Sequence, residues 1–194
     1  MNKLKQILIL ITIFIFVTAC EKSMVYKYKD KPMLVTCTGA DAQLMSEALY
    51  SFFDDITVYY RNIDAPLNEG LSAQEAYANY IYKGANGEAD YANIVSDHSR
   101  KIIKELKKDK RIWNMEGAYS NLNYSSEFVT CLFSKIRKKE FRVTIQSLQE
   151  INSVSPKLLA DRIRVSTRDA FEDPNFGMYI ALDTYYQYLL DIEP

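Results

Sequence analysis

The chain of 194 residues contains one histidine, His98, and one tryptophan. A nucleophilic triad with histidine or a zinc site with several histidines is therefore either built around His98 or absent. We expect it to be absent, because a single imidazole on the apolar stripe of a helix is usually a packed or boundary residue. Beyond residue 20 the chain also lacks a glycine-rich phosphate loop, a GxSxG elbow, an HExxH helix and a CxxC pair. We predict no catalytic residue, metal or cofactor, although scattered carboxylates can still assemble in a fold.

Neither sign of charge dominates, since 24 basic and 25 acidic side chains give a formal net charge of -1. This balance provides no basic field of the kind that binds nucleic acid, so we expect no nucleic-acid partner. Two local groups are basic: Arg100, Lys104, Lys107 or Lys108, and Arg111; then Lys135, Arg137, Lys138, Lys139 and Arg142. Each group is typical of a solvated helix face, and each is also compatible with a patch that meets anionic lipid phosphates.

No hydrophobic run in the sequence is long enough to cross a bilayer. The apolar stretch near the N-terminus extends from Ile7 to Val17, and only residues 6–20 separate the charges of Lys5 and Glu21. A transmembrane helix needs about 20 apolar residues. A basic start, a short apolar run and small residues at its end are instead typical of a secretory signal.

The signal ends in Val17-Thr18-Ala19-Cys20-Glu21. This segment resembles the lipobox of bacterial lipoproteins, with Val17 where that family more often has leucine and Ala19 before the cleavage point. The resemblance covers only the leader. It implies that Cys20 becomes the mature N-terminus and is lipidated, and two or more acyl chains give stable membrane anchoring. It also implies a cell-envelope location, where Glu21 after the cysteine favours the outer membrane of a diderm bacterium on either its periplasmic or its surface face.

These features divide the chain into a signal peptide (1–19), a lipidated N-terminus with a polar tether (20–32) and a helical domain (33–194). The mature chain has the size of one domain. Such a length buries roughly 70% of the unfolded surface, so its core should need no metal or dense disulfide network.

Two cysteines remain once Cys20 is acylated. Cys37 and Cys131 lie in a compartment that permits disulfides. A bridge requires their Cα atoms within about 7 Å. The alternative is two buried free thiols, because unpaired cysteine is among the most buried residue types. The sequence leaves both possibilities open and gives neither cysteine a nucleophilic role.

Apolar residues spaced three and four apart predict helices over about 40–63, 72–84, 88–108 and 125–138, and two more after Ser155-Pro156 and Asp173-Pro174. Ser72 and Glu75 form a capping box for the second helix. Residues 141–151 fit a strand or a helix, and we favour a helix. Residues 33–38 have strand propensity. The prediction is an all-α, single-domain bundle of six to seven helices with a short extended segment near the mature N-terminus.

Two sets of side chains are candidates for a functional site. Among the 15 tyrosines, most fit buried helical stripes, but Tyr82 and Tyr188 fit least well, so we predict them in an aromatic surface that binds a ligand. Asp54 and Asp55 resemble the paired carboxylates of glycoside hydrolysis or cation binding. Adjacent side chains on a helix point apart. We therefore expect the polar side of this helix, which also carries Glu47, to be solvated.

Three functional hypotheses follow. The first is a non-enzymatic, lipid-anchored domain that binds an unknown envelope protein or glycan, with the membrane as a partner through the acyl chains on Cys20. The second is a periplasmic inhibitor or immunity protein directed against a toxin. The third is a carboxylate-dependent hydrolase, which needs two acidic side chains about 5 to 9.5 Å apart in one pocket.

Overall fold

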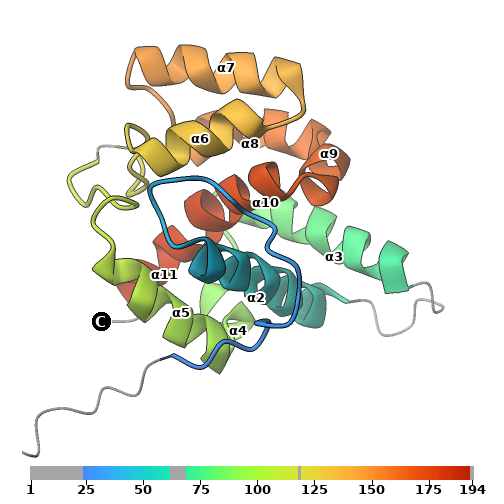
Figure 1. Cartoon of the computed structure of the whole chain (residues 1–194). Coiled ribbons are helices and arrows are strands. Elements are labelled where there is room, and N and C mark those ends of the chain that lie inside the picture. Colours follow the sequence, from blue (N-terminus) through green and yellow to red (C-terminus); the bar gives the residue numbers. More distant parts are fainter. Residues whose placement is uncertain (1–23, 62–68, 118, 193–194) are drawn as a thin grey trace, which may run out of the picture.

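The computed structural model describes residues 24–61, 69–117 and 119–192. Within these ranges the chain is all-α, with one isolated bridge between Trp113 and Leu122 and no strand, which confirms the predicted fold class (Figure 1). The predicted signal peptide and Cys20 lie outside the described residues. Among the helices of the described part, none is both long and apolar enough to span a membrane.

Apart from residues 109–126, which form a long irregular connection between α5 and α6, most elements follow one another closely. In chain order they are α2 (Ala42–Tyr60), α3 (Glu69–Gly84), α4 (Tyr91–Ile94), α5 (Asp97–Lys108), α6 (Glu127–Lys135), α7 (Lys139–Glu150), α8 (Pro156–Val165), α9 (Thr167–Glu172), α10 (Pro174–Ile180), the π-helical segment η1 (Ala181–Tyr186) and α11 (Gln187–Ile192). Because α7 covers most of residues 141–151, the favoured interpretation of that segment as a helix is confirmed.

Helix starts follow local capping chemistry. Ser155 and Asp173 cap α8 and α10, accepting hydrogen bonds from the backbone N–H groups of Leu158 at 3.1 Å and Asn175 at 3.0 Å. A proline follows each cap at the first helical position, where a missing N–H costs nothing. Both starts are therefore confirmed.

Two boundaries differ from the sequence prediction. The helix expected over 88–108 is divided into α4 and α5, because Val95 and Ser96 are extended and Ser96 caps α5 by accepting from the N–H of Ser99 at 3.2 Å. In addition, α3 already begins at Glu69, so the predicted capping box at residues 72–75 does not start it. The helix predicted over 88–108 is consequently two shorter helices, whereas α3 is longer than expected.

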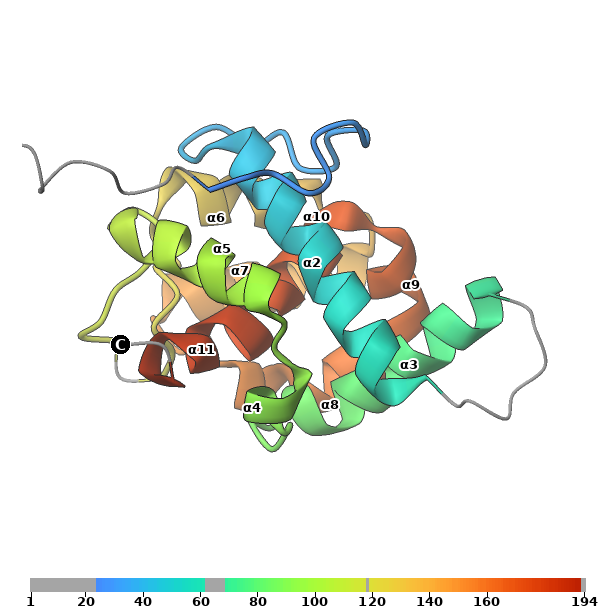
Figure 2. The same ribbon diagram turned by 90° about the horizontal axis from the view of Figure 1, so that it is seen from below.

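The C-terminal helix forms the centre of the bundle. α10, η1 and α11 run continuously and contact α2, α5, α6 and α9 (Figures 1 and 2). Fully buried tyrosines lie on this helix and on α3: Tyr179, Tyr185 and Tyr186 on the former, Tyr77 and Tyr80 on the latter. Several connect helices through their hydroxyls, as Tyr80 does to the Thr184 carbonyl at 2.7 Å and Tyr186 to the Ala48 carbonyl at 2.9 Å. Core packing thus accounts for much of the tyrosine content, as the sequence predicts.

The segment before α2 is packed, although the sequence predicts a tether as far as residue 32. Figure 2 shows residues 24–40 crossing α2. Tyr28 is only 7% exposed, and its backbone N–H donates to the buried Glu47 carboxylate at 3.0 Å. The Tyr28 hydroxyl donates to Asp54. The described part of the expected tether, from residue 24 onward, therefore belongs to the domain.

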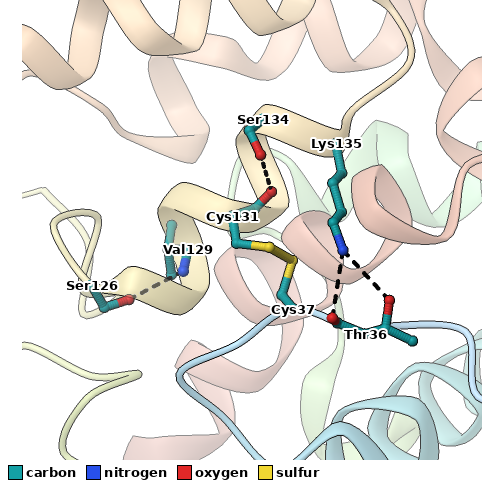
Figure 3. Close-up of a disulfide and its surroundings, with 7 residues drawn as sticks. All are labelled: Thr36, Cys37, Ser126, Val129, Cys131, Ser134 and Lys135. Carbon is teal, nitrogen blue, oxygen red and sulfur yellow. Dashed lines mark hydrogen bonds between the residues drawn. A yellow bond between two sulfur atoms is a disulfide. The ribbon is translucent and has the colours of Figure 1, made fainter.

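Residues 33–38 are extended without joining a sheet. Val35 and Cys37 are buried and alternate with the exposed Thr36 and Thr38. Cys37 forms a disulfide with Cys131 on α6, with 5.7 Å between the Cα atoms, so the structure selects the bridge over two free thiols (Figure 3). Beside the bridge, the Lys135 ammonium reaches the carbonyl and hydroxyl of Thr36, each at 3.5 Å. The extended segment is therefore fastened to α6 as well as to α2.

Candidate functional site

The two tyrosines predicted to form a recognition surface have different surroundings. Tyr82, on α3, is 64% exposed, and its ring centroid lies 5.1 Å from the guanidinium carbon of Arg164. Tyr188, on α11, is half-buried and stacks on Tyr91 with ring centroids 4.7 Å apart. Its hydroxyl also packs against Gly87, where an added Cβ would approach within 2.3 Å. The structure therefore gives Tyr188 a packing role and does not unite it with Tyr82 in one site.

The polar side of α2 is buried, contrary to the solvated face that the sequence predicts. Glu47, Ser51 and Asp55 are 2%, 1% and 6% exposed. Their spacing of four residues places them on one face of the helix. The Ser51 hydroxyl lies 2.8 Å from the Ser99 hydroxyl of α5, and the Asp55 carboxylate accepts from the Tyr185 hydroxyl at 2.6 Å. The prediction was wrong for this face because its residues find polar partners inside the bundle.

Asp54 remains partly exposed and forms an ion pair with Lys27 at 3.0 Å. It and Asp55 therefore point to different partners, as expected of neighbours on a helix. They do not form a catalytic pair.

His98 is a boundary residue that is 17% exposed at its side chain, in agreement with the sequence prediction. Its Nε2 atom lies 2.6 Å from a carboxylate oxygen of Glu47. Glu47 also accepts the backbone N–H groups of Lys27 and Tyr28. This buried carboxylate thus has three partners, which hold the N-terminal segment against α2 and α5.

A second buried carboxylate, Asp183, lies in the π-helical segment η1 and is fully inaccessible to solvent. The Ser120 hydroxyl donates to one of its oxygens at 2.6 Å and the Tyr124 hydroxyl donates to the other at 2.6 Å. The Gln187 side-chain amide, one turn later, donates to the Asp183 backbone carbonyl. π-Helical turns occur frequently at functional sites. Through the hydrogen bonds of Ser120 and Tyr124, the cluster joins the C-terminal helix to the loop of residues 114–125.

Burial raises the pKa of Asp183 from 3.8 to about 6, although hydrogen bonds from Ser120, Tyr124 and Tyr179 oppose the rise. Burial and the nearby carboxylate also raise the pKa of Tyr124 well above its usual range, so its hydroxyl stays protonated. The Tyr179 hydroxyl faces the same carboxylate without a hydrogen bond of good geometry. At neutral pH the cluster therefore contains an ionised carboxylate that accepts hydrogen bonds from two hydroxyls.

Next to this cluster is a pocket of about 310 Å³, which we call the amide pocket. Its lining is Asn114, Glu116, Gly117, Tyr119, Ser120, Leu122, Asn123, Tyr124, Ser125, Gln149, Asn152 and Val154. Amides and hydroxyls dominate this lining, and Tyr119 at its edge is 67% exposed. Glu116 supplies the carboxylate of the lining, whereas Asp183 lies behind Ser120 and Tyr124. The amide pocket thus combines many neutral polar groups with one accessible aromatic ring.

The hydrogen bonds to Asp183 fix the polarity of the pocket wall. An ionised carboxylate only accepts hydrogen bonds, so Ser120 and Tyr124 direct their protons inward. Ser120 also accepts the N–H of Leu122 at 3.0 Å. One lone pair of the Ser120 oxygen and the lone pairs of the Tyr124 oxygen remain for a ligand. The wall is therefore prepared to accept hydrogen bonds from ligand hydroxyl or N–H groups.

A wider and largely apolar groove, of about 570 Å³, lies between the N-terminal segment, α2 and α9. Its polar groups already have partners: the Lys31 ammonium lies 4.7 Å from the ring centroid of Tyr50, and Asp54 binds Lys27 and Tyr28. A ligand in this groove would find few groups to orient it. We therefore take the amide pocket as the candidate functional site.

Sequence reasoning missed Asp183 and its partners. One signal was available, because residues 176–190 form an almost wholly apolar and aromatic run in which Asp183 and Gln187 stand one turn apart. A helix that is apolar on all sides is buried, so a carboxylate within it must have partners. The sequence does not identify those partners, because Ser120 and Tyr124 are about 60 residues away in an irregular loop.

The described residues contain no group of three or more histidine, cysteine, aspartate or glutamate side chains that could hold a metal ion. Comparisons of the chain with protein-family models, with curated proteins and with solved structures give no match. The amide pocket and the predicted lipobox-like leader are therefore the features that point to a function.

Proposed function

We propose that this protein is a lipid-anchored cell-envelope protein whose helical domain binds a glycan in the amide pocket without altering it covalently. The observation that carries the proposal is the wall of Ser120 and Tyr124, whose hydroxyl protons are committed to Asp183 at 2.6 Å each. This wall accepts hydrogen bonds, and a sugar offers several hydroxyl donors close together.

The rest of the lining supports a sugar over other ligands. The Gln149 amide donates to the Tyr124 carbonyl at 2.6 Å, which leaves its oxygen to accept, whereas the Asn123 oxygen accepts the Ser125 N–H at 3.2 Å, which leaves its NH2 group to donate. Together the two amides can match hydroxyl groups in either sense. An exposed ring such as Tyr119 offers a flat apolar face for a pyranose. The volume of about 310 Å³ is at the small end of ligand sites, which suits one or two sugar units.

The anchor is the second part of the proposal. Cys20 at the end of the lipobox-like segment is the acylation site, and the protein is placed in the cell envelope, at the outer membrane of a diderm bacterium. Metabolic labelling with a fatty-acid probe should mark the wild-type chain and leave Cys20→Ser unmarked. An unlabelled wild-type chain would remove the anchor from the proposal without affecting the pocket.

Calorimetric titration tests glycan binding, with a peptidoglycan disaccharide and a lipopolysaccharide core oligosaccharide as probes. We expect at least one probe to bind. Tyr124→Phe should weaken that binding about 10-fold, the equivalent of one lost hydrogen bond. Tyr119→Ala should also weaken it, whereas the equally exposed Tyr82→Ala is a matched control and should not.

Two results would contradict the proposal: no measurable binding of either probe, or binding that Tyr124→Phe and Tyr119→Ala leave unchanged. Chromatography of the recovered probe adds a further distinction. If smaller sugars accumulate, the hydrolase hypothesis replaces the binding one. The inhibitor hypothesis predicts a toxin gene next to this one, and no specific contact in the described residues favours it.

A further inference from the structure

We propose that the exposed basic face of α5 binds the surface of a membrane that contains anionic phospholipid. The orientation that this gives to the domain rests on the anchor at Cys20 proposed above. Three features of the molecule support this proposal: the described chain begins near α5, its first segment is held against the domain, and α5 carries an excess of positive charge.

The described chain begins beside α5. In both views the start of the N-terminal segment, next to the grey trace, lies close to that helix (Figures 1 and 2). The carboxylates of Glu105 on α5 and of Asp41 lie near enough to Tyr26 to help raise its pKa, after burial as the main cause. Cys20 and Met24 are four residue steps apart, which span at most about 14 Å. An acylated Cys20 would therefore keep α5 close to the lipid headgroups.

The N-terminal segment transmits this position because it is fixed to the domain. Glu47 accepts the backbone N–H groups of Lys27 and Tyr28 from inside the bundle. The Tyr50 hydroxyl donates to the Pro32 carbonyl at 2.9 Å, and the disulfide of Cys37 follows. These contacts therefore restrict movement of the N-terminal segment relative to the rest of the domain.

The charges of α5 complement an anionic surface. Residues 97–111 contain seven basic and three acidic side chains, a net charge of +4 in a chain whose net charge is -1. The helix buries Ile102, Ile103 and Leu106 and exposes Lys101 and Lys104 on the other side. Two of the three acidic side chains form local ion pairs, Glu105 with Lys108 and Asp109 with Arg111. A basic side chain near an anionic membrane surface contributes about 1 kcal/mol to binding.

The second basic group of the sequence is less suited to this role. Arg137 and Lys138 pair with Asp173 and Asp169, and Lys135 reaches Thr36. In Figure 1 the helix α7, which carries Lys139, lies at the opposite end of the bundle from α5. Membrane contact through α7 would point the chain start away from the bilayer. The geometry therefore favours α5.

Co-sedimentation with vesicles tests the proposal. The mature chain from position 20 with Cys20→Ser keeps every described residue and removes the acyl chains, so only the protein surface can bind. We expect it to sediment at low salt with vesicles of phosphatidylcholine in which about a third of the lipid is phosphatidylglycerol. We expect little sedimentation with phosphatidylcholine alone, and loss of binding as salt screens the charges.

Variants then locate the surface. Lys101→Gln with Lys104→Gln should weaken binding about 25-fold, which corresponds to about 5-fold for each lysine. Lys139→Gln with Lys157→Gln removes the same charge from exposed positions on α7 and α8 and should change binding little. Fluorescence of the buried Trp113 checks that each variant is folded.

Failure of the chain to sediment with anionic vesicles, or equal effects of the two double variants, would overturn the proposal. These results do not depend on fatty-acid labelling or on glycan titration. The lipid-binding face, the anchor and the amide pocket can therefore fail separately.

Discussion

Replacing Asp183 with asparagine should change how the stability of the domain depends on pH. The side chain is fully buried, and its carboxylate accepts the Ser120 and Tyr124 hydroxyls. Asparagine has almost the same shape, and the Ser120 hydroxyl can reverse to accept from the new amide because Gln187 offers it an acceptor at 3.0 Å. The variant should therefore fold, but it carries no group that ionises at this position.

The pKa of Asp183 fixes the sign and size of the effect. Burial raises this pKa from 3.8 to about 6, so between these values the folded chain holds a proton that the unfolded chain releases. The contribution of Asp183 to the free energy of unfolding should therefore fall as pH rises from about 4 to above 6. A pKa difference of about 2 units corresponds to about 3 kcal/mol. Asp183→Asn should lack this loss, so its stability relative to wild type should rise by about that amount across the window.

Urea unfolding followed by the fluorescence of Trp113 measures this difference at a series of pH values. Trp113 is 6% exposed, and its indole N–H donates a hydrogen bond to the carbonyl of Leu106, so its emission should report the loss of the fold. Asp161→Asn is a matched control that removes a carboxylate 93% exposed on α8. A stability difference between Asp183→Asn and wild type that does not vary with pH would refute the reasoning, because it would mean that Asp183 titrates alike in both states.

Three further predictions test the scaffold. Replacing Cys37 and Cys131 with serine should lower the free energy of unfolding by about 4 to 5 kcal/mol in the chain-entropy model, since the bridge spans 94 residues; an unchanged urea midpoint would contradict a formed disulfide. Glu47→Met should lower the free energy of unfolding by at least about 2 kcal/mol, and it should speed hydrogen exchange at the two backbone N–H groups that donate to Glu47. Unaltered exchange there would argue against a docked N-terminal segment. Ser155→Ala should cost about 1 kcal/mol in thermal unfolding through the lost helix cap, and a negligible shift would argue against that cap.

Helix positions could be predicted from the sequence wherever short-range chemistry determines them. Ser155 and Asp173 with their prolines mark helix starts, because capping bonds and the fixed backbone angle of proline act within a few residues. The break at Val95 and Ser96 was missed. The apolar spacing continues across it from Ile94 to Ile102, so periodicity alone indicates one helix.

The candidate site could not be predicted in the same way, because its contacts join segments distant in sequence. Glu47, Ser51 and Asp55 have the spacing of a solvated helix face, and only the position of α5 and η1 makes that face interior. Likewise, Tyr124 shows no sequence relation to Asp183, since 59 residues separate them. Periodicity identifies which side of a helix is polar, but it does not say whether water or another helix covers that side.

Two of the buried carboxylates, those of Glu47 and Asp183, illustrate why an interior charge can indicate function. Each requires hydrogen bonds to offset the loss of hydration, and the groups that supply them are thereby fixed in place. Glu47 fixes backbone N–H groups of the N-terminal segment, which would give the proposed membrane anchor a definite direction relative to α5. Asp183 fixes two hydroxyls of a loop, which gives the amide pocket a wall of defined hydrogen-bond polarity. An apolar residue at either position could pack as densely, but it would leave the segment unfastened or the hydroxyls free to rotate.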